Sequence, residues 1–190
     1  MSQPELLARV VSALEAADVA YMITGSMVSS VLGDPRLTHD IDIVVNIRAA
    51  QIAGIRAAFS NDEYAFDEVA ATEAIARRDQ FQLLEYASGD KDDFWIYKPE
   101  DPHDRSMFER RHPVSLVGVE CMIPTAEDLI VRKLLWAHEY ESEKHFLDAL
   151  GVFELQFTKL DLAYLKKWIT RLRLQTIWQR LNSEAEPLQE

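Results

Sequence analysis

The stretch that decides the fold runs from Tyr21 to Val45 and reads YMITGSMVSSVLGDPRLTHDIDIVV. It begins and ends with apolar, strand-like residues, yet two aspartates lie in its second strand, where Asp is a poor fit. Side chains alternate between the two faces of a strand, so Asp40 and Asp42 point the same way, away from the face of Ile41. The sequence therefore predicts a strand with one apolar face and two carboxylates displayed together on the open face.

The carboxylate pair has two interpretations. Two ionised carboxylates this close repel each other unless a cation joins them or one takes up a proton. Mg²⁺ binds to proteins through a few carboxylates while it keeps water and phosphate oxygens as its other ligands. An isolated D-x-D, however, is more often a pair of solvent-facing charges on a strand edge, where charge opposes aggregation. Asp40 and Asp42 alone do not decide between a metal site and a charged edge.

A second small motif lies between the first strand and the short helix that we expect after it. Gly25 and Ser26 form a small-residue turn at the start of that helix. Such a turn offers backbone N–H groups and the positive end of the helix dipole to an anion, usually phosphate. Ser26 is equally well explained as a plain N-cap. The combination with Asp40-x-Asp42 favours phosphate and cation binding more than either motif does alone.

The composition narrows the class of protein. At 190 residues, with 48% hydrophobic and 27% charged residues, the chain fits one globular domain or a core with an appendage. The chain has a single cysteine and therefore cannot form an internal disulfide. Its apolar runs are too short for a transmembrane helix, and its first residues lack the pattern of a signal peptide. We expect a cytoplasmic protein with no membrane partner. The formal net charge of −12 argues against binding of bulk DNA.

The rest of the chain predicts an α+β core followed by helices. Apolar spacing predicts helices over residues 4–18, 26–32, 48–59, 67–78 and 104–111. It predicts strands over 21–24, 41–45, 81–86, 94–97, 114–117 and 119–123, the last four as two hairpins. From Pro124 onwards the pattern is helical, with Thr125 as an N-cap. We expect a core over 1–123, a helical region over 124–183 packed on it, either as a separate region or as part of one domain, and a flexible tail over 184–190.

The combined motif resembles the nucleotidyltransferase superfamily with the polymerase-β-like fold. A strand, Gly-Ser, a helix, a turn and a strand with D-x-D is the pattern of that superfamily. The run R-x-T-x-D-h-D is similar to the bacterial branch that includes the AbiEii-type toxin nucleotidyltransferases, and here it is formed by Arg36, Thr38, Asp40 and Asp42. The resemblance covers most of the chain. It implies a mixed β-sheet with flanking helices, followed by a C-terminal helical region.

The resemblance also implies a third carboxylate on a later strand, in the segment GDKDDFWIY. The family pattern of a basic residue, one spacer and an aspartate fits Lys91 followed by Asp93. Strand alternation supports Asp93 if Phe94 faces the core, whereas the opposite alternation favours Asp92. Both aspartates are also explained as charges at the end of a hairpin.

A fainter match lies in the helical region. The segment IPTAEDLIVRKLL resembles a family helix whose lysine, here Lys133, reaches towards a nucleotide phosphate. A solvated helix lysine is an equally good interpretation. Family members carry Arg-Asp where this chain has Lys144-His145, and this departure leaves Lys144 without a role.

The resemblance implies a nucleotidyltransferase that depends on Mg²⁺ or Mn²⁺ and moves NMP from a nucleoside triphosphate to a hydroxyl acceptor, with release of pyrophosphate. The acceptor, whether small molecule, protein or RNA, is not identified by the sequence. Two alternatives stay open: a catalytically silent nucleotide- or partner-binding module of the same fold, and a toxin held by an antitoxin protein. The implied catalytic and metal ligands are Asp40, Asp42 and Asp93, and the implied nucleotide contacts are Gly25, Ser26, Arg36, Thr38 and Lys133.

Overall fold

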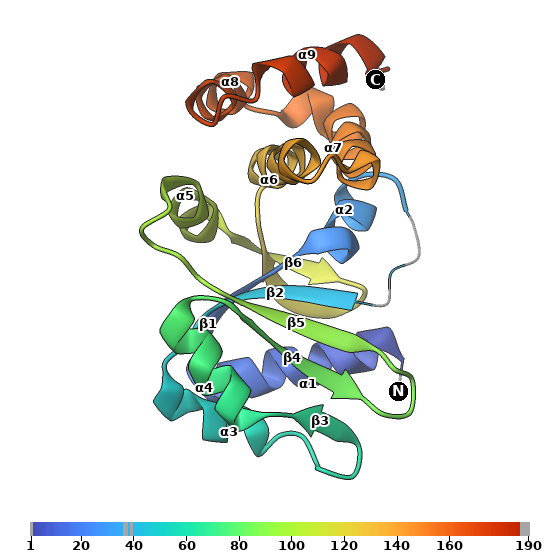
Figure 1. Ribbon diagram of the computed structural model, residues 1–190. Coiled ribbons are helices and arrows are strands. Elements are labelled where there is room, and N and C mark those ends of the chain that lie inside the picture. The colour runs from blue at the N-terminus through green and yellow to red at the C-terminus, as the bar shows by residue number, and fades with distance from the viewer. Residues whose placement is uncertain (1, 36–37, 39, 187–190) are drawn as a thin grey trace. The chain divides into compact units, whose positions relative to one another are not determined.

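The computed structural model describes residues 2–35, 38 and 40–186 of the chain (Figure 1). The chain divides into two compact units. The first combines the described residues of 1–27 with those of 38–123, and the second combines those of 28–37 with those of 124–190. The first unit therefore contains the sheet, and the second contains the C-terminal helices together with residues from the early part of the chain.

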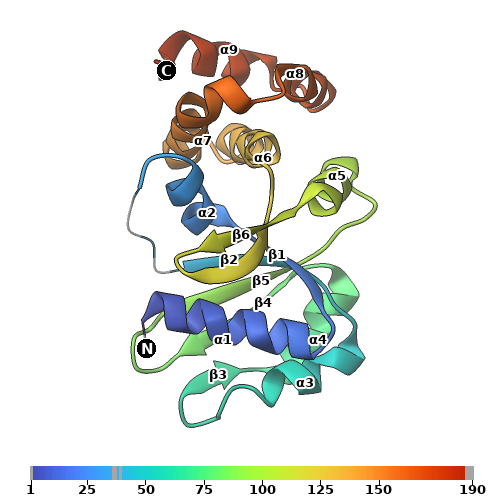
Figure 2. The same ribbon diagram turned by 180° about the vertical axis from the view of Figure 1, so that it is seen from behind.

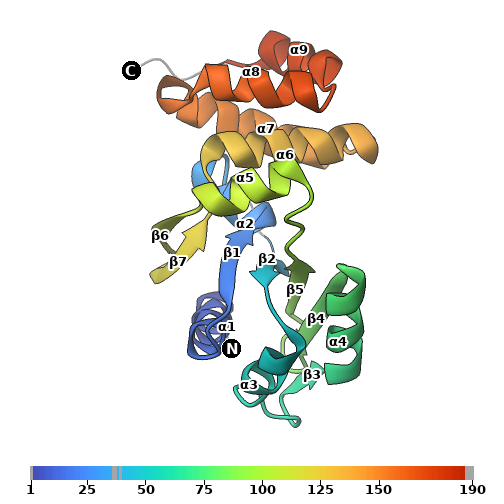
Figure 3. The same ribbon diagram turned by 90° about the vertical axis from the view of Figure 1, so that its left-hand side faces the viewer.

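A mixed β-sheet forms the centre of the first unit. Within the described residues it has five strands in the order β1-β2-β5-β4-β3, which Figure 3 shows side by side from β1 to β4. Strands β2 and β5 run parallel, and every other neighbouring pair is antiparallel. This confirms the predicted mixed sheet. The bounds are β1 Ala20–Thr24, β2 Asp40–Asn46, β3 Tyr64–Phe66, β4 Gln80–Glu85 and β5 Lys91–Ile96.

Strand β2 shows the alternation that its sequence predicts. Ile41 and Ile43 are fully buried, whereas Asp40 is exposed and Asp42 is partly buried. Phe94 of β5, which pairs with Ile43, is also fully buried. The apolar residues of both strands therefore share the core face of the sheet, and the aspartates of β2 lie on the other face.

The helix α1 (Gln3–Ala16) lies along one side of the sheet in Figure 2 and contacts β1. It begins where Glu5 accepts a hydrogen bond from the backbone N–H of Ser2 (2.8 Å), as in a capping box. Its apolar spacing places one side of the helix in the core, as predicted. The buried residues of this side are Leu6, Leu7, Val10, Val11, Ala13 and Leu14.

Strand β5 begins at Lys91 and not at residue 94, so Asp92 and Asp93 lie within the strand and not at the end of a hairpin. The remaining elements of the first unit follow the sequence with two differences. The helix expected over 48–59 is instead a 3-10 turn (Ala49–Gln51) followed by the short α3 (Ile52–Arg56), and Gly54 within it weakens a helix. Strand β3 was not predicted, because three residues are too few to show an alternating pattern. The helices α4 (Glu68–Arg77) and α5 (Pro102–Arg110) lie close to the predicted ranges, and β6 (His112–Leu116) and β7 (Val119–Ile123) form the predicted second hairpin.

The second unit consists mainly of helices. These are α6 (Ala126–Glu139), α7 (Glu143–Gln156), α8 (Leu162–Arg171) and α9 (Gln175–Glu184), and α6 and α7 lie side by side in Figures 1 and 3. Helix α2 (Gly25–Leu32) ends in this unit, where Gln156 Nε2 donates a hydrogen bond to the carbonyl of Leu32 (2.9 Å). The last residues of the predicted tail, 187–190, lie outside the described residues. In the part of the chain that is described, no helix is long and apolar enough to cross a membrane.

Candidate active site

Three of the predicted site residues lie on the open face of the sheet. The parallel register pairs Asp42 of β2 with Asp93 of β5. Paired residues of neighbouring strands point to the same face, so Asp93 joins the face on which Asp40 and Asp42 lie. The Asp40 side chain is 55% exposed and the Asp93 side chain is 10% exposed. Asp40 is therefore open to solvent, and Asp93 is nearly buried. Two neighbouring strands thus supply three carboxylates to one surface.

Asp92 lies on the opposite face. It pairs with Ile41 on one side and Leu83 on the other, both buried, and is itself fully buried. Neither of its carboxylate oxygens has a hydrogen-bond partner among the described residues. Burial, assisted by the negative charge of Asp93, raises the pKa of Asp92 to about 8. Asp92 therefore carries a proton at neutral pH, and it is Asp93 that shares the face of Asp42.

A lysine lies among the carboxylates of the open face. Lys91 Nζ is 2.9 Å from Asp93 Oδ2 and 4.0 Å from Asp40 Oδ1. The hydrogen bond to Asp93 raises the pKa of Lys91 despite the opposing effect of desolvation, and the charges of Asp40 and Asp42 raise it further. The ammonium group is therefore held in its charged form. Sequence reasoning used Lys91 only to locate Asp93 and did not expect it in the site.

Two further side chains orient the carboxylates. Gln82 Nε2 donates a hydrogen bond to Asp93 Oδ1 (2.7 Å), and Trp95 Nε1 donates one to Asp42 Oδ1 (3.2 Å). Neither Trp95 nor Gln82 is among the site residues that the sequence analysis indicates. The signal that would identify them is strand alternation combined with the register of β4 and β5. That register was not available from the sequence.

The start of α2 meets Asp42. Gly25 has a φ of +71°, and a Cβ at this position would lie 1.9 Å from Asp42 Oδ2. Only glycine fits there, because any other residue would meet the carboxylate and adopt a backbone conformation that L-residues avoid. Ser26, at the second position of α2, is buried. The first turn of α2 and the carboxylate of Asp42 are thus in immediate contact.

Thr24 is a residue of this site that sequence reasoning missed. It pairs with Asp42 across the antiparallel β1–β2 ladder, and its side chain is buried. Its hydroxyl Oγ1 finds no hydrogen-bond partner in the described part of the chain. Thr is common in strands, so nothing in the sequence distinguishes it from a packing residue.

The other predicted nucleotide contacts of the β1–β2 segment are placed only in part. Arg36 lies outside the described residues. The Thr38 hydroxyl is 3.4 Å from the Asp40 carbonyl oxygen, to which it donates a hydrogen bond, and Gln3 Nε2 donates to the Thr38 carbonyl oxygen (2.8 Å). Thr38 is thus tied to the backbone that leads into β2.

Lys133 belongs to the second unit, in helix α6. Its side chain is 1% exposed, and its Nζ donates a hydrogen bond to Asp148 Oδ2 of α7 (2.7 Å). The ammonium group also lies 5.9 Å from the centre of the Trp136 ring. The interpretation of Lys133 as a solvated helix lysine is therefore wrong. In this structure it forms a buried ion pair that joins two helices.

The carboxylates fit a cation, although they are not arranged as a metal site in this structure. Among the residues described, no group of three or more His, Cys, Asp or Glu side chains is placed to hold a metal ion. Both oxygens of Asp93 have a partner in this structure, Oδ1 with Gln82 Nε2 and Oδ2 with Lys91 Nζ. The same carboxylates already surround an ammonium group, and carboxylate oxygens are the ligands that Mg²⁺ prefers. The donor set is therefore compatible with a divalent cation.

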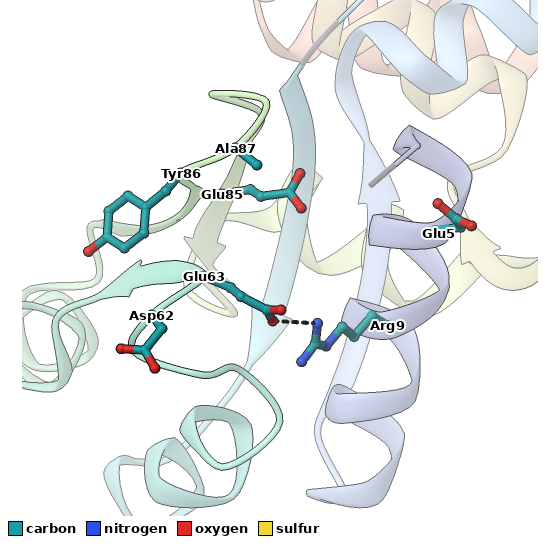
Figure 4. A pocket seen from close by; sticks show the side chains of 7 residues that line it. All are labelled: Glu5, Arg9, Asp62, Glu63, Glu85, Tyr86 and Ala87. Carbon is teal, nitrogen blue, oxygen red and sulfur yellow. Dashed lines mark hydrogen bonds and ion pairs between the residues drawn. The ribbon is translucent and has the colours of Figure 1, made fainter.

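A cavity of about 790 Å³ lies elsewhere in the first unit. Figure 4 shows its lining side chains, with an ion pair between Arg9 Nη1 and Glu63 Oε2 (3.5 Å). Four carboxylates and one guanidinium surround this space. The lining residues are Glu5, Arg9, Asp62, Glu63, Glu85, Tyr86 and Ala87.

Comparisons with known proteins bear on the fold. A scan against protein-family models and a search of curated proteins give no match. Among solved structures, an antigenic nucleotidyltransferase-like protein from Paracoccidioides brasiliensis is 15% identical with a TM-score of 0.51, over 98% of this chain and 96% of that one. The antibiotic-resistance factor ANT(2'')-Ia is 12% identical with a TM-score of 0.53, over 95% of this chain and 96% of that one.

These likenesses cover almost the whole chain at low sequence identity, so they inform the fold. They agree with the mixed sheet, the flanking helices and the C-terminal helical region that the sequence motif implied. The closer relation to the AbiEii-type branch stays a prediction. The chain therefore has a nucleotidyltransferase-like fold.

Proposed function

We propose that the protein is a divalent-metal-dependent nucleotidyltransferase, which moves NMP from a nucleoside triphosphate to a hydroxyl acceptor. The observation that carries this proposal is the gathering of Asp40, Asp42 and Asp93 around a cationic group, beside the first turn of α2. Phosphoryl transfer depends on charge neutralisation and positioning more than on covalent chemistry. A carboxylate cluster next to the N-terminus of a helix is suited to both tasks.

The start of α2 would bind the phosphates. The backbone N–H groups at a helix N-terminus and the helix dipole together favour an anion. Gly25, whose missing side chain leaves room for the Asp42 carboxylate, would keep that carboxylate close to phosphates bound at the first turn of α2, and the Ser26 hydroxyl would add a donor. Arg36 and Thr38 stay predictions as further contacts to the triphosphate.

Asp40, Asp42 and Asp93 would hold Mg²⁺ or Mn²⁺. Such an ion, when bound, would neutralise triphosphate charge and increase the acidity of the acceptor hydroxyl. Trp95 and Gln82 fix the orientation of Asp42 and Asp93, which reduces the reorganisation needed on binding.

The transfer itself needs a base and a leaving group. The acceptor oxygen forms a bond to the α-phosphorus, the bond from that phosphorus to the bridging oxygen of the β-phosphate breaks, and pyrophosphate leaves. Asp93 is suited to take the acceptor proton, because Gln82 holds its carboxylate in one orientation at the surface of the sheet.

Lys133 has a different place in the proposal. To contact a phosphate it would have to leave the buried ion pair with Asp148, and breaking a buried pair costs about 3–5 kcal/mol. We therefore assign Lys133 first to the stability of the helical unit, and a nucleotide contact from this residue remains a prediction.

One observation favours a second candidate, a catalytically silent module of the same fold. The ammonium of Lys91 already compensates part of the charge of the carboxylates, which a module without a metal would require. The toxin role, with an antitoxin as partner, rests on the sequence resemblance alone. Growth arrest on expression that is relieved by Asp42→Ala would support it, and harmless expression of the wild type would oppose it.

The proposal is tested by calorimetric binding of each nucleoside triphosphate with and without Mg²⁺. We expect binding that needs Mg²⁺ in the wild type and is lost in the Asp40→Asn/Asp42→Asn double variant. The Glu68→Gln/Glu73→Gln double variant, which removes the same charge from exposed positions of α4, is the matched control and should bind normally. A well-folded wild type that binds no triphosphate would refute the transferase. Binding without any release of pyrophosphate, across a panel of acceptors, would favour the silent module.

A further inference from the structure

The side chain of Lys91 lies among the carboxylates of the candidate site. Its Nζ contacts Asp93 Oδ2 at 2.9 Å and lies 4.0 Å from Asp40 Oδ1, so it lies between carboxylates of two strands. The register that pairs Lys91 with Asp40 places it there by strand geometry. Its side chain is 32% exposed, which leaves the ammonium a path to solvent.

Each oxygen of Asp93 already has a partner while Lys91 is in this place. Gln82 Nε2 donates to Oδ1 (2.7 Å), and Lys91 Nζ takes up Oδ2. A divalent ion bound at Asp93 Oδ2 would therefore meet the ammonium group at the same oxygen, and one bound at Oδ1 would lie beside the ammonium group on the same carboxylate. Two cations within bonding distance of one carboxylate oxygen repel each other, so the ion and the ammonium group compete.

We propose that Lys91 is an internal counter-cation, which holds the carboxylate cluster in its resting state and must be displaced before a divalent ion binds to Asp93. This inference rests on the proposed function, since it concerns the same metal–triphosphate site. Lysine suits the task because its ammonium is a compact charge on a flexible four-carbon stem. A change of side-chain rotamer moves it off Asp93 without a change in the strand.

The displaced ammonium then has a new partner. A triphosphate bound at the start of α2 brings negative oxygens to the edge of the same cluster, and Lys91 exchanges a carboxylate for a phosphate. Metal and nucleotide therefore bind cooperatively: the ion binds weakly alone, because it competes with Lys91, and more tightly when phosphate receives the ammonium. By linkage, each ligand raises the affinity of the other to the same extent.

A merely structural Lys91–Asp93 ion pair would behave differently. Loss of Lys91 would then loosen Asp93, so affinity for the metal would stay the same or fall. A competing Lys91 gives the opposite sign. Its loss strengthens binding of the metal alone and weakens binding of the nucleotide in the presence of metal. These two opposite changes separate the two roles.

The experiment uses the full chain and Mn²⁺ as the probe. Free Mn²⁺ is measured by electron paramagnetic resonance in wild type and in Lys91→Met, with Lys98→Met as a control, because Lys98 is an exposed lysine shortly after the same strand. We expect Lys91→Met to bind Mn²⁺ alone about tenfold more tightly than wild type, and Lys98→Met to stay within about twofold. Calorimetry at saturating Mn²⁺ should then show weaker triphosphate binding by Lys91→Met.

A second variant guards against a change in folding. Lys91→Arg keeps the charge beside Asp93, so its affinity for Mn²⁺ alone should remain close to that of the wild type. Equal or weaker Mn²⁺ binding by Lys91→Met, compared with Lys98→Met, would overturn the inference and leave the proposed function standing. If Mn²⁺ binds to none of these proteins in the presence of triphosphate, the proposed function fails, and the inference fails with it.

Discussion

Asp92 and Asp93 are neighbours in the chain, but they lie on opposite faces of β5 and have opposite chemistry. Asp93 lies on the open face, where Gln82 and Lys91 bind its carboxylate. Asp92 lies on the core face, where burial raises its pKa to about 8 and no described side chain bonds to it. The same side chain is thus a charged candidate ligand on one face and a protonated core residue on the other. Strand alternation, and not residue type, decides which of the two aspartates lies on the face of the candidate site.

Of the changes that test this comparison, Asp93→Asn on the open face should have the largest effect on nucleotidyl transfer. The amide keeps the shape and the contact with Gln82 but loses the charge that would hold a cation and accept a proton. We expect nucleotidyl transfer, measured as pyrophosphate release, to fall about 10³-fold or more. Asp92→Asn is the matched change on the core face and should alter transfer only slightly. Similar losses in the two variants would break the comparison.

Gly25→Ala should give the next largest effect, on both stability and binding. The added Cβ would lie 1.9 Å from Asp42 Oδ2, at a φ of +71°. We expect a loss of roughly 2 kcal/mol or more in the free energy of unfolding, together with loss of triphosphate binding. Chemical denaturation and calorimetry measure the two effects.

Gly89→Ala provides the control for backbone strain alone. Gly89 has a φ of +75°, and a Cβ there would meet nothing within 4 Å. We expect a loss of about 1 kcal/mol and normal triphosphate binding. If the two glycine variants behave alike, the close approach of Gly25 to Asp42 does not matter for the site.

On the core face, Asp92 should make stability depend on pH. Its folded-state pKa of about 8 lies above the ordinary value of 3.8, so the folded protein keeps a proton that the unfolded chain releases. The free energy of unfolding therefore falls as pH rises from about 4 to about 8, by at most about 1.4 kcal/mol per pH unit, and the effect levels off above pH 8. Asp92→Asn should remove this slope and be the more stable protein at pH 8.

Urea denaturation between pH 5 and pH 9 measures the slope. Asp62→Asn, a change at an exposed position in the same unit, serves as the control and should keep the slope of the wild type. A wild type and an Asp92→Asn variant that follow parallel curves over this range would show that Asp92 is not held protonated in the core.

Trp95→Phe should give the smallest effect. Phenylalanine keeps most of the ring but loses the hydrogen bond from Nε1 to Asp42 Oδ1. We expect the affinity for Mg²⁺-triphosphate to fall about threefold to tenfold, in line with about 1 kcal/mol for one hydrogen bond, with no change in the free energy of unfolding beyond about 1 kcal/mol. A change of more than a hundredfold would mean that the indole contacts the nucleotide itself.

The sequence predicted those features of the fold that depend on side-chain alternation within one strand or on the residues of one turn. The faces of Asp40, Asp42 and Ile41 followed from alternation within one strand. The glycine at position 25 could be proposed as a phosphate turn, but its contact with Asp42 could not, because that contact joins two elements across the β1–β2 pair.

The residues that the sequence missed depend on register. Lys91 bridges Asp40 and Asp93 only because β2 and β5 run parallel with one particular pairing, between segments far apart in the chain. The choice between Asp92 and Asp93 stayed open until the buried face of β5 was known. The helix pattern around Lys133 is compatible with a solvated residue or a phosphate contact, because such a pattern does not show that Asp148 of another helix lies beside it.

A metal–triphosphate complex bound on the open face of β2 and β5 would lie close to the indole N–H of Trp95, which donates a hydrogen bond to Asp42. The NMR signal of this N–H therefore reports whether the complex binds there. The chain has four tryptophans, so Trp95→Phe assigns the Trp95 signal in a nitrogen-15 NMR spectrum. We predict that substoichiometric Mn²⁺ with ATP broadens the Trp95 indole signal first and most strongly, and leaves it sharp in Asp40→Asn/Asp42→Asn. If the Trp95 signal stays sharp in the wild type while another tryptophan broadens, the complex binds elsewhere and the account is contradicted.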